Sequence, residues 1–217
     1  MVLISPISIV HTDWQAKRFN VSLTKKQVEN SPDTDTRQPI SRQHEAAYLG
    51  YYEYPYYWGG PYLWGPEIFP AGLALPAAPS AMPMADSIES QPADSHLRST
   101  IAVTGSHIDA TEGEIGHVHG FIVDDEAWAI RYLEVATRNW WPGKKVLVSA
   151  AWIDRVSWAD SRVYASLSRD AIQTALEFVE SIVITREYET RLSNHYGKHP
   201  YWLRDAGHKP AFSLTRV

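Results

Sequence analysis

Two histidines separated by a single residue, His117 and His119, are the side chains in this sequence best placed to do chemistry. Along a β-strand, alternating side chains would put both imidazoles on one face, where a divalent metal could bind them with a hard carboxylate ligand. A histidine close to carboxylates also titrates near neutral pH and can relay protons. The third interpretation is that two polar residues simply face solvent. The carboxylates that could complete either site are Glu114, Asp124 and Asp125.

No other catalytic pattern stands out in the sequence. The acidic run 124–126 lacks the alternating ligands and the glycine of a calcium loop, so it predicts a hairpin turn. The serines lie in no Gly-x-Ser-x-Gly elbow, and there is no glycine-rich phosphate loop. The absence of cysteine excludes disulfides, thiolate ligands and a cysteine nucleophile. We therefore expect a protein that is not an enzyme, with no cofactor and no bound metal.

Aromatic residues are abundant and clustered, with nine Trp and twelve Tyr in 217 residues. Large amphipathic rings are enriched at protein interfaces, but they can also seal the ends of a small barrel. Both roles remain open for these rings. The aromatic residues that we select as a candidate interaction surface are Trp140, Trp141, Tyr57, Trp58, Tyr201 and Trp202.

The sequence contains an internal repeat. Residues 2–58 align without a gap to residues 146–202, at a constant offset of 144. Such self-similarity predicts a duplicated structural unit. About fifty residues precede Val146 without a counterpart in the first copy, so we expect the first copy to be partial. A late start codon, a truncation or a barrel completed by another chain would each explain this. Residues identical at both positions include Trp14 and Trp158, Arg18 and Arg162, Arg42 and Arg186, and Glu45 and Glu189.

Composition then divides the chain into four parts. A Pro/Gly/Ala-rich segment should be extended or disordered, because proline at this density removes hydrogen-bond donors and blocks regular structure. The last residues should form a loose tail. The predicted parts are the partial copy (1–58), the linker (59–98), the complete copy (99–205) and the tail (206–217).

The complete copy shows short strand patterns separated by turns. Its fold is predicted to be mainly β, a small antiparallel barrel with short flanking helices, plus the partial second copy. Residues 2–23 should also form two strands, and pairing of their like edges favours a homodimer. Strands are expected near 100–106, 114–123, 129–136, 144–153 and 162–167, and helices near 169–175 and 185–195. The predicted buried residues include Ile115, Val118, Ile130, Leu133, Val146 and Val148.

Four segments carry a resemblance to a known family. They are GSHIDATEGEIGHV (105–118), FIVDD (121–125), WAIRYL (128–133) and WWPGKKVLVS (140–149). Together they resemble the PRC-barrel family, named for the cytoplasmic domain of the photosynthetic reaction centre H subunit. The family also includes a domain of a ribosome-maturation factor. This chain is most similar to bacterial members that have two barrels in tandem. In those proteins, motifs like the segments 31–35, 41–45 and 48–64 of this sequence follow the first barrel.

The resemblance implies a PRC-type barrel and a non-enzymatic binding or adaptor module, linked to reaction-centre-like electron transfer or its regulation. It implies protein partners, such as a membrane electron-transfer complex. Because the H-subunit domain is associated with proton delivery toward a quinone, it also favours a relay through His117, His119, Asp124 and Asp125. The alternative function is a metal- or proton-relay-dependent enzyme that uses the two histidines and nearby carboxylates.

Charge and hydropathy restrict the location and the partners. A net charge of −5 and a pI near 6.0 disfavour nucleic-acid binding and the ribosome-associated role. The chain has no run of 18 apolar residues, and no Lys or Arg precedes the apolar N-terminus, so neither a membrane span nor an export signal is expected. We therefore expect a cytoplasmic protein.

Overall fold

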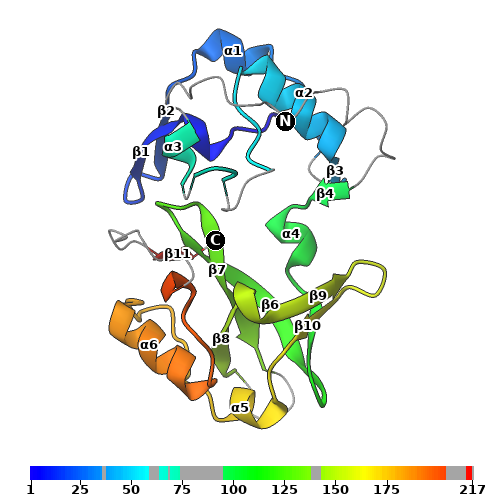
Figure 1. Ribbon diagram of the computed structural model, residues 1–217, viewed down its shortest axis with the longest axis vertical. Coiled ribbons are helices and arrows are strands. Elements are labelled where there is room, and N and C mark those ends of the chain that lie inside the picture. The colour runs from blue at the N-terminus through cyan, green and yellow to red at the C-terminus, as the bar shows by residue number, and fades with distance from the viewer. Residues whose placement is uncertain are drawn as a thin grey trace. The chain divides into compact units, whose positions relative to one another are not determined.

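The computed structural model describes residues 1–35, 38–58, 64–67, 69–73, 95–137, 143–203 and 214–216. The chain divides into two compact units, Met1–Ser99 and Thr100–Val217, called unit one and unit two below (Figure 1). None of the described helices has the length and apolar character that crossing a bilayer requires.

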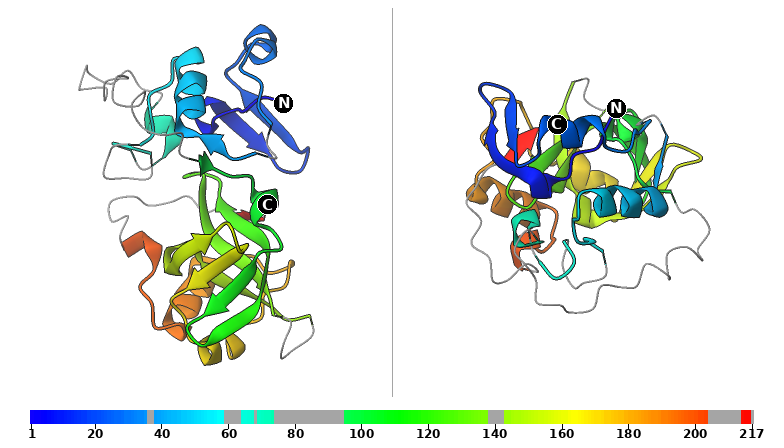
Figure 2. Two further views of the ribbon diagram at one scale, coloured as in Figure 1. Left: turned by 90° about the vertical axis from the view of Figure 1, so that its right-hand side faces the viewer. Right: turned by 90° about the horizontal axis from the view of Figure 1, so that it is seen from above.

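Unit one contains a β-hairpin and several short helices (Figure 2). Tyr48 on α2 and Tyr52, the residue that caps its C-terminus, are buried and pack with Leu49 against Leu3 and Leu23. The elements of unit one are η1 (Pro6–Ser8), β1 (Ile9–Asp13), β2 (Arg18–Val21), α1 (Lys25–Glu29), β3 (Ile40–Ser41), α2 (Arg42–Tyr51), α3 (Pro70–Leu73) and β4 (Ser95–Leu97). The two short strands β3 and β4 pair with each other in antiparallel fashion.

Unit two is a mixed α/β structure around one mostly antiparallel sheet (Figure 1). The strand order is β8-β7-β6-β5-β10-β9, and β11 also pairs with β6. Its strands are β5 (His107–Ala110), β6 (Gly113–Asp124), β7 (Ala129–Ala136), β8 (Lys145–Ser149), β9 (Ile153–Ser157), β10 (Arg162–Ala165) and β11 (Leu214–Arg216). Its helices are α4 (Thr100–Val103), η3 (Ala150–Trp152), α5 (Arg169–Gln173), α6 (Arg186–His195) and η4 (Tyr201–Leu203).

The sheet does not close into the barrel that the sequence predicts. Among the described strands no ladder joins β8 to β9, so these two strands remain at opposite edges. The short helix η3 carries the chain directly from β8 to β9, and β10 then adds to β5 in parallel rather than antiparallel orientation. The pairings therefore show an open, mostly antiparallel sheet with helices.

Apolar side chains from the strands and from α5 and α6 form one core in unit two. Ile115, Val118, Leu133, Val146 and Val148 are buried, as predicted from the sequence. Ile130 is 41% exposed, so its predicted burial is wrong. The β6–β7 register shifts at Arg131, between the pairs Ile122–Tyr132 and Val123–Ile130. A bulge interrupts alternation, so residues beyond it no longer follow the simple inside–outside pattern.

Other expectations about secondary structure also differ from the structure. The strand expected at 144–153 ends at Ser149 and is followed by the short helix η3. The region predicted as a strand at 100–106 begins with helix α4, where the Thr104 amide donates to the Thr100 carbonyl at 2.9 Å. The predicted linker contains α3 and β4, although residues 74–94 lie outside the described residues. The predicted loose tail contains β11, whose pairing with β6 depends on a contact about ninety residues away in sequence. The expected helices at 169–175 and 185–195 and the two strands within 2–23 are confirmed.

The offset of 144 residues that relates the two sequence copies also relates their structures. Residue for residue, the bounds of η1, β1, β2, α1 and α2 recur as those of η3, β9, β10, α5 and α6. The register shift in the hairpin recurs as well. Lys17 and its counterpart Ser161 both have positive φ, at 53° and 50°. Since hairpin geometry, helix bounds and turn conformation all coincide, the two segments are copies of one substructure.

Candidate functional site

Each copy of the repeat forms a charged aromatic cluster, and the two clusters have the same composition and geometry. The first cluster consists of Arg42, Glu45, Tyr57 and Trp58. The second cluster consists of Arg186, Glu189, Tyr201 and Trp202.

Local helix chemistry places the charged pair. Ser41 and Thr185 are the N-caps of α2 and α6, and each side-chain oxygen accepts a hydrogen bond from the backbone three residues later. The arginine is therefore the first helical residue, and the glutamate lies three residues on, on the same helical face. The Arg Nη1–Glu Oε2 distance is 3.1 Å in both clusters.

Aromatic rings then cover the guanidinium groups. The guanidinium carbon lies 3.9 Å from the tryptophan ring centroid in both clusters, Arg42 over Trp58 and Arg186 over Trp202. The neighbouring tyrosine meets the tryptophan edge-to-face, with centroids 5.0 Å apart in the first cluster and 5.2 Å in the second. A guanidinium held against an indole gains cation–π energy while the carboxylate neutralises its charge.

The glutamates are buried, and burial decides the electrostatics. Glu45 is 2% exposed and Glu189 is fully buried. Burial raises the pKa of Glu189 above its ordinary value of 4.5, opposed by a hydrogen bond from the Tyr132 hydroxyl, 2.8 Å away, and by the Arg186 charge. In the first cluster the Tyr57 hydroxyl donates to Glu45, and burial together with that bond raises the pKa of Tyr57 to about 12. The hydroxyl groups of Tyr132 and Tyr57 therefore stay protonated, and each donates a hydrogen bond to the glutamate of its cluster.

The second cluster extends further into the sheet than the first. The guanidinium of Arg131 lies 4.0 Å from the Tyr201 ring centroid and donates to Asp124 Oδ2 at 2.9 and 3.0 Å. Asp124 also accepts from the backbone amides of Glu126 and Ala127, which fixes the β6–β7 turn. Asp124 is predicted as part of a proton relay, but its carboxylate accepts hydrogen bonds from Arg131 and from the backbone of the turn.

The structure does not bring the predicted relay residues together. His117 and Asp124 lie seven residues apart on β6, which corresponds to roughly 23 Å along an extended strand. Asp125 lies in the turn after β6. The β6–β7 register shifts at His119, between Val118 and Gly120. In the described residues, no group of three or more His, Asp or Glu could hold a metal ion.

The two histidines instead have different carboxylate neighbourhoods. His119 Nε2 lies 4.0 Å from Oε1 of the fully buried Glu134, which also pairs with Lys145 Nζ at 2.9 Å. His117 lies opposite His107, whose Nδ1 is 3.1 Å from Glu114 Oε1. That contact is the main reason for a lowered pKa of Glu114.

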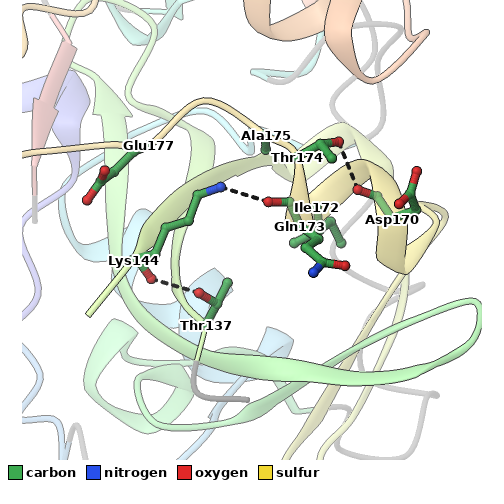
Figure 3. Close-up of a pocket in the computed structure, with 8 residues that line it drawn as sticks. All are labelled: Thr137, Lys144, Asp170, Ile172, Gln173, Thr174, Ala175 and Glu177. Atoms are coloured by element: carbon green, nitrogen blue, oxygen red, sulfur yellow. Dashed lines mark hydrogen bonds between the residues drawn. The ribbon is translucent and has the colours of Figure 1, made fainter. Parts of the chain in front are cut away.

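A pocket of about 520 Å³ lies where the end of β7 and the start of β8 face α5 (Figure 3). Some of the polar groups there bond to one another. Lys144 Nζ donates to the Gln173 carbonyl at 2.8 Å, and the Thr137 hydroxyl donates to the Lys144 carbonyl at 3.0 Å. The residues that line the pocket are Thr137, Lys144, Asp170, Ile172, Gln173, Thr174, Ala175 and Glu177.

Four of the six aromatic residues selected from the sequence lie in the clusters, and Trp140 and Trp141 lie outside the described residues. Trp58 and Trp202 are half-buried, so each indole covers an arginine and still reaches the surface. The arginines and glutamates beneath them are not among the residues selected from the sequence. The available signal was that both residue types are identical in the two copies, whereas an Arg–Glu pair at this helical spacing otherwise indicates a solvated surface pair.

Replacing Arg186 by lysine should lower the free energy of unfolding of unit two by about 1–2 kcal/mol, because an ammonium cannot stack on Trp202 and hold Glu189 with the same planar geometry. Urea unfolding followed by circular dichroism measures the change. Arg169→Lys, at the exposed start of α5, is the matched control. Equal stability of the two variants would contradict a stabilising role for the stacked guanidinium.

Comparison with known proteins identifies no relative of this chain. A scan of family models gives no match for the chain, and a search of curated proteins also gives none.

Proposed function

We propose that this chain is a non-enzymatic binding module of the PRC-barrel type, which attaches to a protein partner through its two clusters. The observation that carries the proposal is the duplication of a half-buried tryptophan stacked on an arginine that pairs with a buried glutamate, with the same 3.9 Å separation between guanidinium carbon and indole centroid in both copies. A rigid arginine–indole surface has the composition of an interface hot spot, because it offers a large contact area that is already ordered before binding.

The class of partner follows from the resemblance rather than from the clusters. Segments 105–118 and 140–149 resemble the PRC-barrel family, whose reaction-centre member serves a membrane electron-transfer complex. The proposed partner is therefore a cytoplasmic face of such a complex or a regulator of it. Fold alone does not determine function, so the clusters and not the sheet are the part to test.

The test uses affinity-tagged full-length chain expressed in its native host, with co-purified proteins quantified by mass spectrometry. We expect a stoichiometric partner with the unmodified chain and at least a tenfold lower recovery with the double variant Trp58→Ala/Trp202→Ala, since loss of a central hot-spot residue costs about 2 kcal/mol or more. The control is Trp158→Ala, which removes an indole that is 46% exposed on the β9–β10 turn.

Circular dichroism of the double variant must first show that the fold is retained. Equal recovery of the partner with the unmodified chain and the double variant would exclude the clusters as the binding surface. Equal loss with Trp158→Ala would likewise contradict a specific role for the two clusters.

A further inference from the structure

The two hairpins of the repeat are equivalent in conformation but differ in exposure. Strand β2 corresponds residue for residue to β10, and each pairs with the preceding strand in the same register. Arg18, Phe19 and Asn20 are exposed in unit one, and Phe19 is 50% exposed. Val163, which corresponds to Phe19, is only 1% exposed. A difference in surroundings, not in hairpin geometry, must therefore explain the exposure.

In unit two the outer edge of β10 is occupied by β5. The two strands are parallel, and Val163 pairs with Ile108 while Tyr164 pairs with Asp109. The Asp109 carboxylate accepts from Arg162 Nη1 at 2.7 Å, and Glu114 accepts from Nη2 at 3.3 Å. Strand β5 thus supplies backbone hydrogen bonds, an apolar contact and the negative charge of Asp109, while Glu114 at the start of β6 supplies a second negative charge.

In unit one the described residues show no corresponding strand. Among the described strands, β2 pairs only with β1. Arg18 occupies the position of Arg162 but makes no ion pair with any described carboxylate. An unpaired strand edge offers its amide and carbonyl groups to another chain, and a basic residue on it selects acidic partners.

We propose that the outer edge of β2, residues 18–21, binds an extended acidic segment of a partner protein as a parallel strand. In the bound segment an apolar residue lies beside Phe19, as Ile108 lies beside Val163, and the next residue is acidic and reaches Arg18, as Asp109 reaches Arg162. This surface lies on a different element from either cluster, so the inference does not depend on the proposed function.

A synthetic peptide with the sequence of residues 105–118 is a suitable probe, because it contains β5 and both carboxylates that bind Arg162. Binding of the fluorescently labelled peptide to the full chain is measured by anisotropy. Amide hydrogen exchange then shows which strand becomes protected. We expect saturable binding that weakens with salt, with new protection at residues 18–21 and none at β10.

Arg18→Ala and a peptide with Asp109→Asn and Glu114→Gln should each weaken binding about tenfold, the equivalent of one ion pair of about 1.4 kcal/mol. Val10→Ala removes an apolar side chain that is 73% exposed on the other strand, and should leave binding unchanged. Three results would overturn the proposal: no binding, equal binding by Arg18→Ala, or protection at β10, which would indicate exchange with the chain's own β5. Protection of β2 without peptide in a dimer would also overturn it, because a second copy would then occupy the edge.

Discussion

Gly116→Ala is expected to lower the free energy of unfolding of unit two by about 3 kcal/mol or more. Gly116 lies where β6 passes close to β7, and its φ is 153°. A Cβ at this position would meet the carbonyl oxygen of Ala136 at 2.1 Å, well inside contact distance. The atoms that the new methyl group would meet belong to the backbone of Ala136 and Thr137, so they cannot turn away as a side chain could. β6 and β7 would have to separate, and this separation would break hydrogen bonds between the strands and open the core.

Urea unfolding followed by circular dichroism, together with amide exchange in β6 and β7, measures this loss. Gly50→Ala is the control for the same chemical change, because Gly50 lies in α2 with no atom near its missing Cβ. Alanine there should stabilise the helix by about 0.5–1 kcal/mol. A Gly116→Ala variant with unchanged exchange in β6 would show that the close approach of the two strands is not present.

Glu189→Ala should lower the free energy of unfolding of unit two by about 3–5 kcal/mol, because it leaves the Arg186 guanidinium and the Tyr132 hydroxyl without their buried acceptor. Glu189→Gln keeps an oxygen that can accept from Tyr132 and removes only the negative charge, so its loss should be smaller. Glu187→Ala is the control, since Glu187 is exposed two residues earlier on the same helix. Equal unfolding curves for Glu187→Ala and Glu189→Ala would contradict the buried acceptor role.

The difference in free energy of unfolding between the unmodified protein and Glu189→Gln should change with pH in a defined direction. Burial raises the pKa of Glu189 in the folded state above 4.5, so the folded state holds this proton more tightly than the unfolded chain does. The resulting stabilisation is fully present below the unfolded pKa and is lost as pH rises through the folded value. The advantage of the unmodified protein over Glu189→Gln should therefore be larger at pH 4 than at pH 7. Urea unfolding at the two pH values measures it, and an advantage that grows with pH would contradict the raised pKa.

Local patterns in the sequence predicted several elements well. The β7 bounds 129–136 and the helices near 169–175 and 185–195 depend on short-range signals, namely alternation and helical spacing. The offset of 144 residues could also be found from sequence, because a duplicated substructure retains the residues that its turns and caps require. Arg42 and Arg186 could have been identified in the same way, as identical charged residues that both copies keep.

Tertiary structure alone decided how these elements combine. Whether the sheet closes depends on which edges pair, and the parallel addition of β10 to β5 leaves no signal in local alternation. The bulges at His119 and Arg131 are one-residue offsets between strands, and local sequence patterns do not reveal them. The burial of Glu189 was also not predictable, because the carboxylate of a helical Arg–Glu pair becomes buried only when other elements pack over it, here with Tyr132, 57 residues away in sequence.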